Sequence, residues 1–372
     1  MTNQRRQLKR RLTPYLNTAE VTDDHKHDHP ASASELYFVA YDSEKFIDGN
    51  LQDLRRIKDE LDKWPVLWLN IEGLGSTELI EEIGALFNVH PLALEDVVHV
   101  HQRAKYEQYD EHSFLVAHMI EGKDHVHTEQ VCLYIGDHFV LSFQEGPIDA
   151  TKPVVERLKK GQTTLRRQGP DYLAYAIIDS IIDAYYPVLE TFGEKLERLE
   201  ELILRVPSKR IVGRVHRAKR ELLALRRALF PLREALGAIL RTAPAGFTEN
   251  TLIHMRDCYD HVVQITDLIE TYRELASDLM DVYLSMISYK LNEVMKVLTV
   301  ITSICAPPSL IAAIYGMNFD RASPYNMPEL GWQYGYPYAI CLMIVASSTL
   351  CFFIFRSDRW TGGLVGKETN ED

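Results

Sequence analysis

The chain has 372 residues and a formal net charge of −12, from 41 Lys and Arg against 53 Asp and Glu. Nucleic-acid-binding proteins are expected to be basic, so this charge balance argues against a nucleic-acid partner. The length predicts at least two structural units. The five cysteines form no CxxC pair, which argues against a disulfide framework and a zinc site. No G-x-x-x-x-G-K-[ST], G-x-S-x-G or H-E-x-x-H motif occurs, so the sequence indicates neither a nucleotide-driven pump nor a hydrolase, and we expect no enzyme.

Residues 1 to 34 are predicted to form a disordered extension, because they hold too few apolar side chains to bury a core. A basic cluster at Arg5–Arg11 suggests contact with anionic lipids, and the histidines His25, His27 and His29 suggest metal capture. A solvated tail is the simpler interpretation. No apolar segment follows the basic residues, so we expect no signal peptide.

Residues 35–170 are predicted to form an α/β domain with a mixed sheet. Short runs of apolar and β-prone residues predict strands, and helical periodicity after a Ser N-cap predicts one helix. The expected strands are Leu36–Tyr41, Val66–Ile71, Ser113–Ile120 and Glu129–Phe143, the last with a hairpin turn at Gly136-Asp137, and the expected helix is Ser76–Phe87.

Residues 171–250 are predicted to form a helical hairpin. Two long periodic segments, Asp171–Leu204 and Lys209–Leu240, are broken at Pro207-Ser208. Charged residues three or four positions apart on these segments indicate solvated faces and by themselves carry no function.

Neither Gly nor Pro occurs from Thr251 until Pro307, so one helix of roughly 97 Å is expected from Thr251 to Tyr315. The stretch Val297–Phe319, which includes the end of this helix, contains no charged side chain and is long enough to cross a bilayer. Residues 251–319 are therefore a stalk helix that continues into a first membrane helix. An external loop (320–335), a second membrane helix (336–355) and a cytoplasmic tail (356–372) complete the expected α+β membrane protein.

Basic residues near the spans predict the orientation. Lys290 and Lys296 precede the first span, and Arg356 and Arg359 follow the second, whereas the loop between the spans holds Arg321 alone. Because positive residues concentrate on the cytoplasmic side, both termini are expected in the cytoplasm.

One face of the long helix is polar or small. Its members recur at spacings of three and four residues, which is the helical repeat. They are Asn292, Met295, Leu298, Thr299, Thr302, Ala306, Ser309 and Ala313. This set, the pore stripe below, fits either the lining of a pore between several copies or a small-residue packing face between membrane helices.

Several motifs resemble the CorA family of magnesium transporters. Tyr315-Gly316-Met317-Asn318-Phe319 ends the first of two C-terminal spans, and Met327-Pro328-Glu329-Leu330 follows in the loop. The run Asn292–Thr299 before the first span is also similar, as are His90–Asp96 and Gln102–Glu107 in the soluble region. The resemblance covers about residues 35 to 360.

The resemblance implies a homo-oligomer, a pentamer, in a bacterial or archaeal plasma membrane, with the lipid bilayer and divalent cations as partners. It would pass Mg²⁺, with Co²⁺ and Ni²⁺ as further ions. Gly316, Met317 and Asn318 would form the selective mouth, Glu329 would attract cations, and Met295 and Leu298 would close the pore. Cytoplasmic Mg²⁺ between neighbouring subunits would regulate it, and the residues implied are Asp96 with Asp257, and Glu95 or Asp179 nearby.

Three positions depart from the family pattern. Ala104 stands where a proline is usual, Ala306 where a bulkier methionine can occur, and Asp320–Asn326 lengthen the loop. Two alternatives stay open: a zinc transporter of the same family, and a membrane-anchored sensor without transport. His99 and His101 suggest a weak metal site, although loop solvation explains them more simply.

Overall fold

The structure is a computed structural model that describes residues 34–318 and 327–356, except positions 52, 53, 55, 56, 58, 59, 62, 101, 123–125, 147, 162 and 163. The side chains of 330, 354 and 355 are also not described. The predictions for the N-terminal extension, His101, Asp320–Asn326 and the C-terminal tail therefore lie outside the described residues. The chain divides into two compact units, Met1–Asp281 and Val282–Asp372.

The first unit contains a seven-stranded mixed sheet in the order β2-β1-β3-β7-β6-β5-β4. The strands are β1 (Glu35–Tyr41), β2 (Phe46–Leu51), β3 (Val66–Glu72), β4 (Lys105–Tyr109), β5 (His112–Glu121), β6 (His127–Ile135) and β7 (Phe139–Gln144). β3 and β7 pair in parallel, with Leu69 opposite Leu141, and the other pairs are antiparallel. The mixed sheet expected from the sequence is confirmed.

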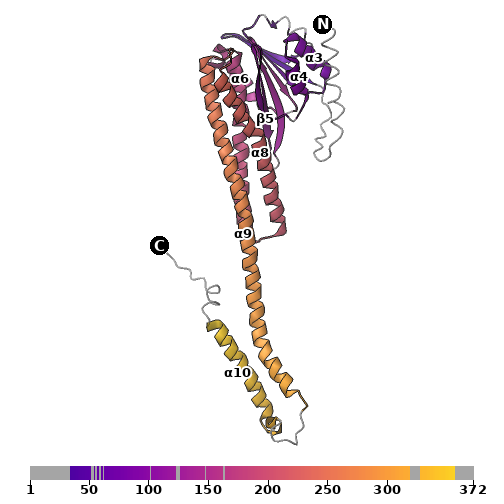
Figure 1. Ribbon diagram of the computed structural model, residues 1–372, viewed down its shortest axis with the longest axis vertical. Coiled ribbons are helices and arrows are strands. Elements are labelled where there is room, and N and C mark those ends of the chain that lie inside the picture. The colour runs from indigo at the N-terminus through magenta and orange to yellow at the C-terminus, as the bar shows by residue number, and fades with distance from the viewer. Residues whose placement is uncertain are drawn as a thin grey trace. The chain divides into compact units, whose positions relative to one another are not determined.

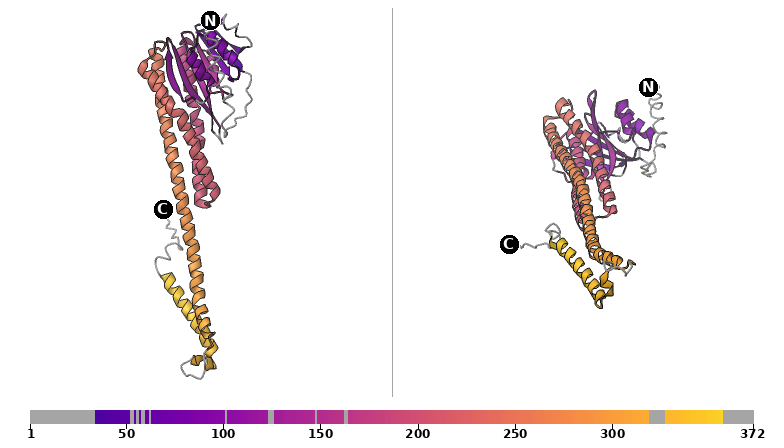
Figure 2. Two further views of the ribbon diagram at one scale, coloured as in Figure 1. Left: turned by 45° about the vertical axis from the view of Figure 1, so that its right-hand side comes forward. Right: turned by 60° about the horizontal axis from the view of Figure 1, so that its bottom comes forward.

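Helices cover both faces of this sheet. Helices α3 (Thr77–Leu86) and α4 (Pro91–Val98) lie on one face, and the helical layer with α6 (Pro170–Asp183) and α8 (Lys209–Thr242) lies on the other (Figures 1 and 2). The α3–α4 side is apolar because Ile80, Ile83, Leu94 and Val97 are buried against the strands. Ser76 caps α3 as expected, since its hydroxyl accepts a hydrogen bond from the main-chain N–H of Leu79 at 3.3 Å.

The helical layer begins with α5 (Lys152–Lys159), the short helix η1 (Thr164–Arg167) and α6 (Pro170–Asp183), followed by α7 (Tyr185–Arg205) and α8 (Lys209–Thr242). The prediction of one segment over Asp171–Leu204 is wrong, because α6 ends at Asp183 and α7 begins after Ala184. Pro187 supplies the reason. It lacks the N–H that would bond to the Asp183 carbonyl, and its ring crowds that carbonyl.

Helix α9 runs without interruption from Glu249 to Tyr315, a length of 67 residues or roughly 100 Å. The long helix expected from the sequence is therefore confirmed, with Pro307 and Pro308 inside it. In the first unit its buried face recurs at helical spacing and packs with the other helices of the layer. The buried residues are Thr251, Met255, Cys258, Val262, Ile265, Thr266, Ile269, Ala276 and Leu279.

The second unit contains the end of α9, the short helix η2 (Pro328–Gly331) and α10 (Gly335–Arg356). Among the described residues, α9 and α10 are the two helices long and apolar enough to cross a membrane. In the views of Figures 1 and 2, the C-terminal half of α9 and α10 form an antiparallel pair. The hydroxyl of Ser347 on α10 donates a hydrogen bond to the main-chain carbonyl of Ile304 on α9 at 3.1 Å.

Candidate functional site

The pore stripe is exposed along the whole of the apolar part of α9. All its members from Asn292 to Ala313 are exposed in the single chain. Met295 and Leu298, the two large apolar members, leave 57% and 53% of their surface accessible. Within the described part of the chain this face stays exposed, so it is available there either to water or to further copies of the chain.

Hydroxyl groups on the pore stripe donate hydrogen bonds to main-chain carbonyls of their own helix. Thr299, Thr302 and Ser309 each donate to the carbonyl four residues earlier, at 2.7, 2.8 and 2.8 Å. A hydroxyl has one donor and two acceptor lone pairs, so these groups keep only acceptor capacity toward their surroundings. A face of this kind suits species that donate hydrogen bonds, such as the water shell of a metal cation.

Helix α10 packs against a different face of α9. The partly buried side chains in this part of α9 include Val300, Ser303, Pro307, Ile311 and Tyr315, again at spacings of three and four. At about 100° per residue they are displaced from the pore stripe by roughly a third of a turn. The hydrogen bond from Ser347 to the Ile304 carbonyl also lies off the pore stripe. Both interpretations of the pore stripe, a pore lining and a packing face, stay predictions.

The predicted mouth lies where α9 ends. The main-chain N–H of Gly316 donates to the Ala312 carbonyl at 2.9 Å, and that of Met317 to the Ile314 carbonyl at 3.2 Å, so the last turn tightens. A Cβ at Gly316 would lie 3.2 Å from the Ala312 oxygen, which leaves little room for a side chain. Gly316, Met317 and Asn318 are all exposed.

Glu329 lies on η2, between the two apolar helices in sequence, and is half-buried. Its main-chain carbonyl accepts a hydrogen bond from the N–H of Trp332 at 3.1 Å. Gly335 fits tightly against the same carbonyl, because a Cβ there would lie 2.2 Å from the oxygen. The position of Glu329 therefore depends on the absence of a side chain at the start of α10.

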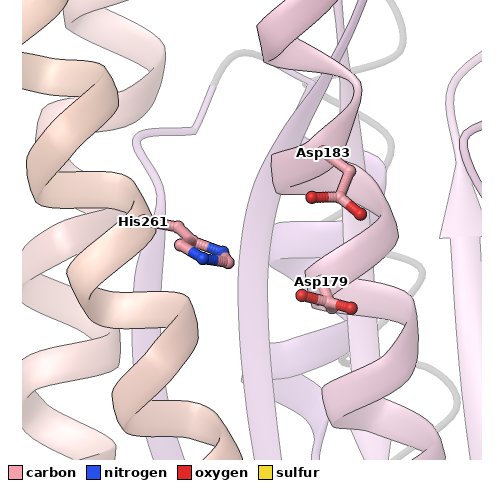
Figure 3. A group of neighbouring side chains, drawn as sticks. All are labelled: Asp179, Asp183 and His261. Carbon is pink, nitrogen blue, oxygen red and sulfur yellow. The ribbon is translucent and has the colours of Figure 1, made fainter.

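A second group of side chains lies in the first unit, far along the sequence from the mouth. Asp179 and Asp183 on α6 and His261 on α9 each place a possible ligand atom within 4.8 Å of the others. Figure 3 shows the imidazole of His261 pointing from α9 toward the two carboxylates. Because i and i+4 positions share a helical face, Asp179 and Asp183 face α9 together.

Further groups surround this cluster. Asp257 lies one turn before His261, with its Oδ2 3.9 Å from Nε2 of the imidazole. The thiol of Cys258 lies 3.8 Å from Oδ1 of Asp179. Burial raises the pKa of the Asp179 carboxyl above its ordinary value, and the charge of Asp183 raises it further. A cation bound here would relieve this repulsion.

Glu95 and Asp96 lie elsewhere, on α4 beside the sheet. Oδ2 of Asp96 is 2.7 Å from Nζ of Lys105, so this carboxylate already has a cationic partner in the chain. Among the described residues no hydrogen bond or ion pair joins Asp96 to Asp257 or Asp179 within one chain. The expected pairing of Asp96 with Asp257 is one between neighbouring subunits, and it stays a prediction.

Sequence reasoning did not assign a role to His261 or Lys105. For His261 the sequence did hold a signal, because Asp257 lies four residues earlier and therefore on the same face of the helix. No local pattern indicates that β4 brings Lys105 onto α4.

Comparison with known proteins identifies the family. The sequence model of the CorA-like Mg²⁺ transporter protein family matches residues 65–357. The cobalt/magnesium transport protein CorA of Thermotoga maritima is 39% identical over 329 residues, which cover 88% of this chain and 92% of that protein. CorA of Methanocaldococcus jannaschii, also named as a cobalt/magnesium transport protein, is 24% identical over 84% of this chain and 97% of its own length.

A solved structure agrees in fold. The complete structure of the CorA magnesium transporter from Methanocaldococcus jannaschii superposes with a TM-score of 0.73 at 21% identity, covering 86% of this chain and 98% of that one. The match to the family model extends over strands β3 to β7 and the helices through α9 and α10, and it begins after β1 and β2. The chain belongs to the CorA-like Mg²⁺ transporter family.

Proposed function

We propose that this chain forms a homo-oligomer, a pentamer, that conducts Mg²⁺ into the cytoplasm of a bacterium or archaeon, with Co²⁺ and Ni²⁺ as further ions. The plasma membrane holds it with both termini on the cytoplasmic side. The observation that carries the proposal is the exposed pore stripe, whose hydroxyls present acceptors on a helix that α10 covers on another face. The domain division predicted from the sequence is part of the same proposal.

One helix cannot enclose a pore, but several copies around an axis can do so with the stripe inward. Mg²⁺ gives up its water reluctantly, so a path for the hydrated ion needs acceptors for water protons more than direct carboxylate ligands. Thr299, Thr302 and Ser309 offer such acceptors. Met295 and Leu298 would form apolar constrictions that lose water and close the path. Small side chains at Ala306 and Ala313 leave the middle of the path wide.

The mouth is the proposed selective element. Asn318 offers an amide oxygen to the waters of the ion, beside the exposed backbone of Gly316 and Met317. Glu329 supplies the negative charge that draws cations toward the loop. An amide holds a divalent ion more weakly than a carboxylate does, and conduction requires that the ion leave as readily as it enters.

The membrane potential would drive uptake. It supplies about 2.3 kcal/mol per charge per 100 mV, hence about 4.6 kcal/mol for a divalent ion. A path driven in this way must close when cytoplasmic Mg²⁺ is sufficient. Carboxylates at Glu95, Asp96, Asp179 and Asp257 are the proposed ligands of the regulatory ion, and their hard oxygens suit Mg²⁺.

Closure would follow from charge. Bound Mg²⁺ neutralises facing carboxylates of neighbouring subunits and holds the subunits together. Loss of the ion leaves mutual repulsion, which spreads the stalks and widens the constrictions. Burial, and after it the charge of Asp183, raises the pKa of Asp179, so the ionised carboxylate is unfavourable without a cation, which supports a cation site here. Zinc transport by a member of the same family, and a membrane-anchored sensor without transport, are the alternatives.

Divalent flux into liposomes tests the proposal. The purified full-length protein is reconstituted with a magnesium-sensitive dye inside, under an inside-negative potential, and Asn318→Ala is measured in parallel. Potential-driven Mg²⁺ uptake that disappears in the variant is expected. Flux of Zn²⁺ alone would favour the zinc alternative. No flux of any divalent ion, at low and high internal Mg²⁺, would favour the anchored sensor.

A further inference from the structure

Lys105 lies between two carboxylates at the edge of the sheet. It is the first residue of β4, and its Nζ is 2.7 Å from Oδ2 of Asp96 on α4 and 3.1 Å from Oε1 of Glu107 on β4. The side chains of Lys105 and Asp96 are 21% and 15% exposed, whereas that of Glu107 is 38% exposed. The ammonium group thus has one sheltered partner and one more open partner.

Neighbouring groups hold this arrangement in place. The Tyr109 hydroxyl donates to Oε2 of Glu107 at 2.5 Å, and the Tyr109 ring stacks on His90 with centroids 4.2 Å apart. The side-chain amide of Gln130 donates to the main-chain carbonyl of Asp96 at 3.2 Å. Tyr109 thus holds the Glu107 carboxylate, and Gln130 holds the main chain of Asp96. Lys105 bridges the two carboxylates through a flexible stem with three donors, so it can shift toward either one.

We propose that Lys105 is a built-in competitor of the regulatory cation at Asp96, and that it sets the cation concentration at which the protein responds. The proposal rests on the proposed function, because Asp96 enters it as a ligand of the regulatory ion. Without the ion, Lys105 neutralises Asp96. A divalent ion that approaches Asp96 must drive Lys105 onto Glu107 or bind against its positive charge, and either route weakens binding.

The geometry predicts opposite effects for the two neighbours of Asp96. Removing the charge of Lys105 leaves Asp96 free for the ion, so less Mg²⁺ is needed. Removing the charge of Glu107 leaves Lys105 with Asp96 as its remaining carboxylate and takes away local negative charge, so more Mg²⁺ is needed. General damage to the fold would not produce shifts of opposite sign.

The test measures the Mg²⁺ concentration that raises the melting temperature of the detergent-solubilised full-length protein by a fixed amount, the same for every variant, since a bound ion stabilises the folded state by mass action. Lys105→Gln is expected to lower this concentration about tenfold, equivalent to ~1.4 kcal/mol. Glu107→Gln is expected to raise it severalfold, and Lys105→Arg to leave it nearly unchanged. The concentration for half-inhibition of flux should shift in the same directions.

Lys195→Gln is the matched control. Lys195 forms an ion pair with Glu221 at 2.9 Å, with side chains 23% and 13% exposed, away from Asp96. Its removal should leave the Mg²⁺ concentration unchanged. An unchanged Mg²⁺ concentration in Lys105→Gln, or equal shifts in Lys105→Gln and Lys195→Gln, would overturn the proposal.

Asp96→Asn separates the two levels of the argument. If Asp96→Asn abolishes the Mg²⁺ response while Lys105→Gln does not shift it, Asp96 is a ligand of the regulatory ion and Lys105 does not compete with that ion. If Asp96→Asn responds to Mg²⁺ as the wild type does, Asp96 is not a ligand of the regulatory ion. The proposed role of Asp96 and the proposed competition by Lys105 would then both be wrong.

Discussion

Ser347 on α10 donates a hydrogen bond to the main-chain carbonyl of Ile304 on α9, and this contact fixes which side of α9 faces its own second helix. Ser303, the residue before Ile304, is partly buried, whereas Thr302 on the pore stripe is exposed. Within the described residues, one face of α9 thus meets α10 and another stays exposed. In the proposed assembly, copies of the chain would meet around an axis through this exposed face.

Loss of the Ser347 hydroxyl should weaken the helix pair slightly. Hydrogen bonds between membrane helices average about 0.6 kcal/mol, because the unpaired groups find other partners. Ser347→Ala should lower the melting temperature in detergent by roughly 1–3 °C and leave Mg²⁺ flux nearly unchanged. A complete loss of flux with the fold intact would mean that Ser347 itself lines the path.

A side chain at Gly335 should disturb the loop that carries Glu329. Because a Cβ at Gly335 would lie 2.2 Å from the Glu329 carbonyl, Gly335→Ala must displace η2. We expect Mg²⁺ uptake at low external Mg²⁺ to fall severalfold, measured as initial flux into liposomes. Gly331→Ala is the control, since nothing lies within 4 Å of its added Cβ, and normal flux in both variants would remove Glu329 from the mouth.

Neutralising Asp179 should stabilise the cation-free protein. Folding raises the pKa of the Asp179 carboxyl. Such a group stabilises the folded state below its unfolded pKa, and this contribution is lost as the pH rises through the folded pKa. The ionised carboxylate is therefore unfavourable in the folded state at neutral pH. Asp179→Asn should raise the melting temperature in excess chelator by roughly 1–3 °C. The further rise on adding Mg²⁺ should shrink. A lower melting temperature in chelator would contradict the assigned repulsion.

Asp257→Ala should weaken closure by cytoplasmic Mg²⁺. Asp257 is exposed on α9 beside His261, so its loss removes a proposed ligand without emptying a core position. Inhibition of flux by internal Mg²⁺ should require severalfold more of the ion. Asp260→Ala, at another exposed position on the same helix, should behave as the wild type. Unchanged inhibition in Asp257→Ala would count against Asp257 as a ligand.

The long helix was predictable from sequence because its signal is local and uninterrupted. The absence of Gly and Pro between Thr251 and Pro307 predicted the long helix, and its uncharged apolar end predicted the membrane span. The motif from Gly316 to Asn318 then identified the family. β2 and β4 were not predicted, because Asp48, Gly49 and Asn50 are poor strand formers and β4 is a polar edge strand.

Contacts between distant segments could not be predicted in this way. The approach of His261 to Asp179 requires α6 and α9 to pack side by side, and the pairing of Lys105 with Asp96 requires the edge of the sheet to meet α4. Neither contact follows from periodicity. Periodicity predicts which face of a helix is buried, but it does not predict which other element packs against that face. Pro187 did carry a local signal for the break between α6 and α7, and that signal was outweighed by the periodic pattern around it.

Accessibility of Ser309 tests most directly whether the pore stripe lines the path. In a chain whose Cys305, Cys341 and Cys351 are replaced by alanine, Ser309→Cys places a thiol on the stripe, and Ser303→Cys places one on the face toward α10. A small charged thiol reagent added outside reconstituted liposomes should reduce Mg²⁺ flux about tenfold in Ser309→Cys and leave Ser303→Cys unaffected, with Mg²⁺ slowing the reaction at Ser309→Cys. Full flux after complete labelling of Ser309→Cys, or equal block of both variants, would contradict a conduction path along this face of α9.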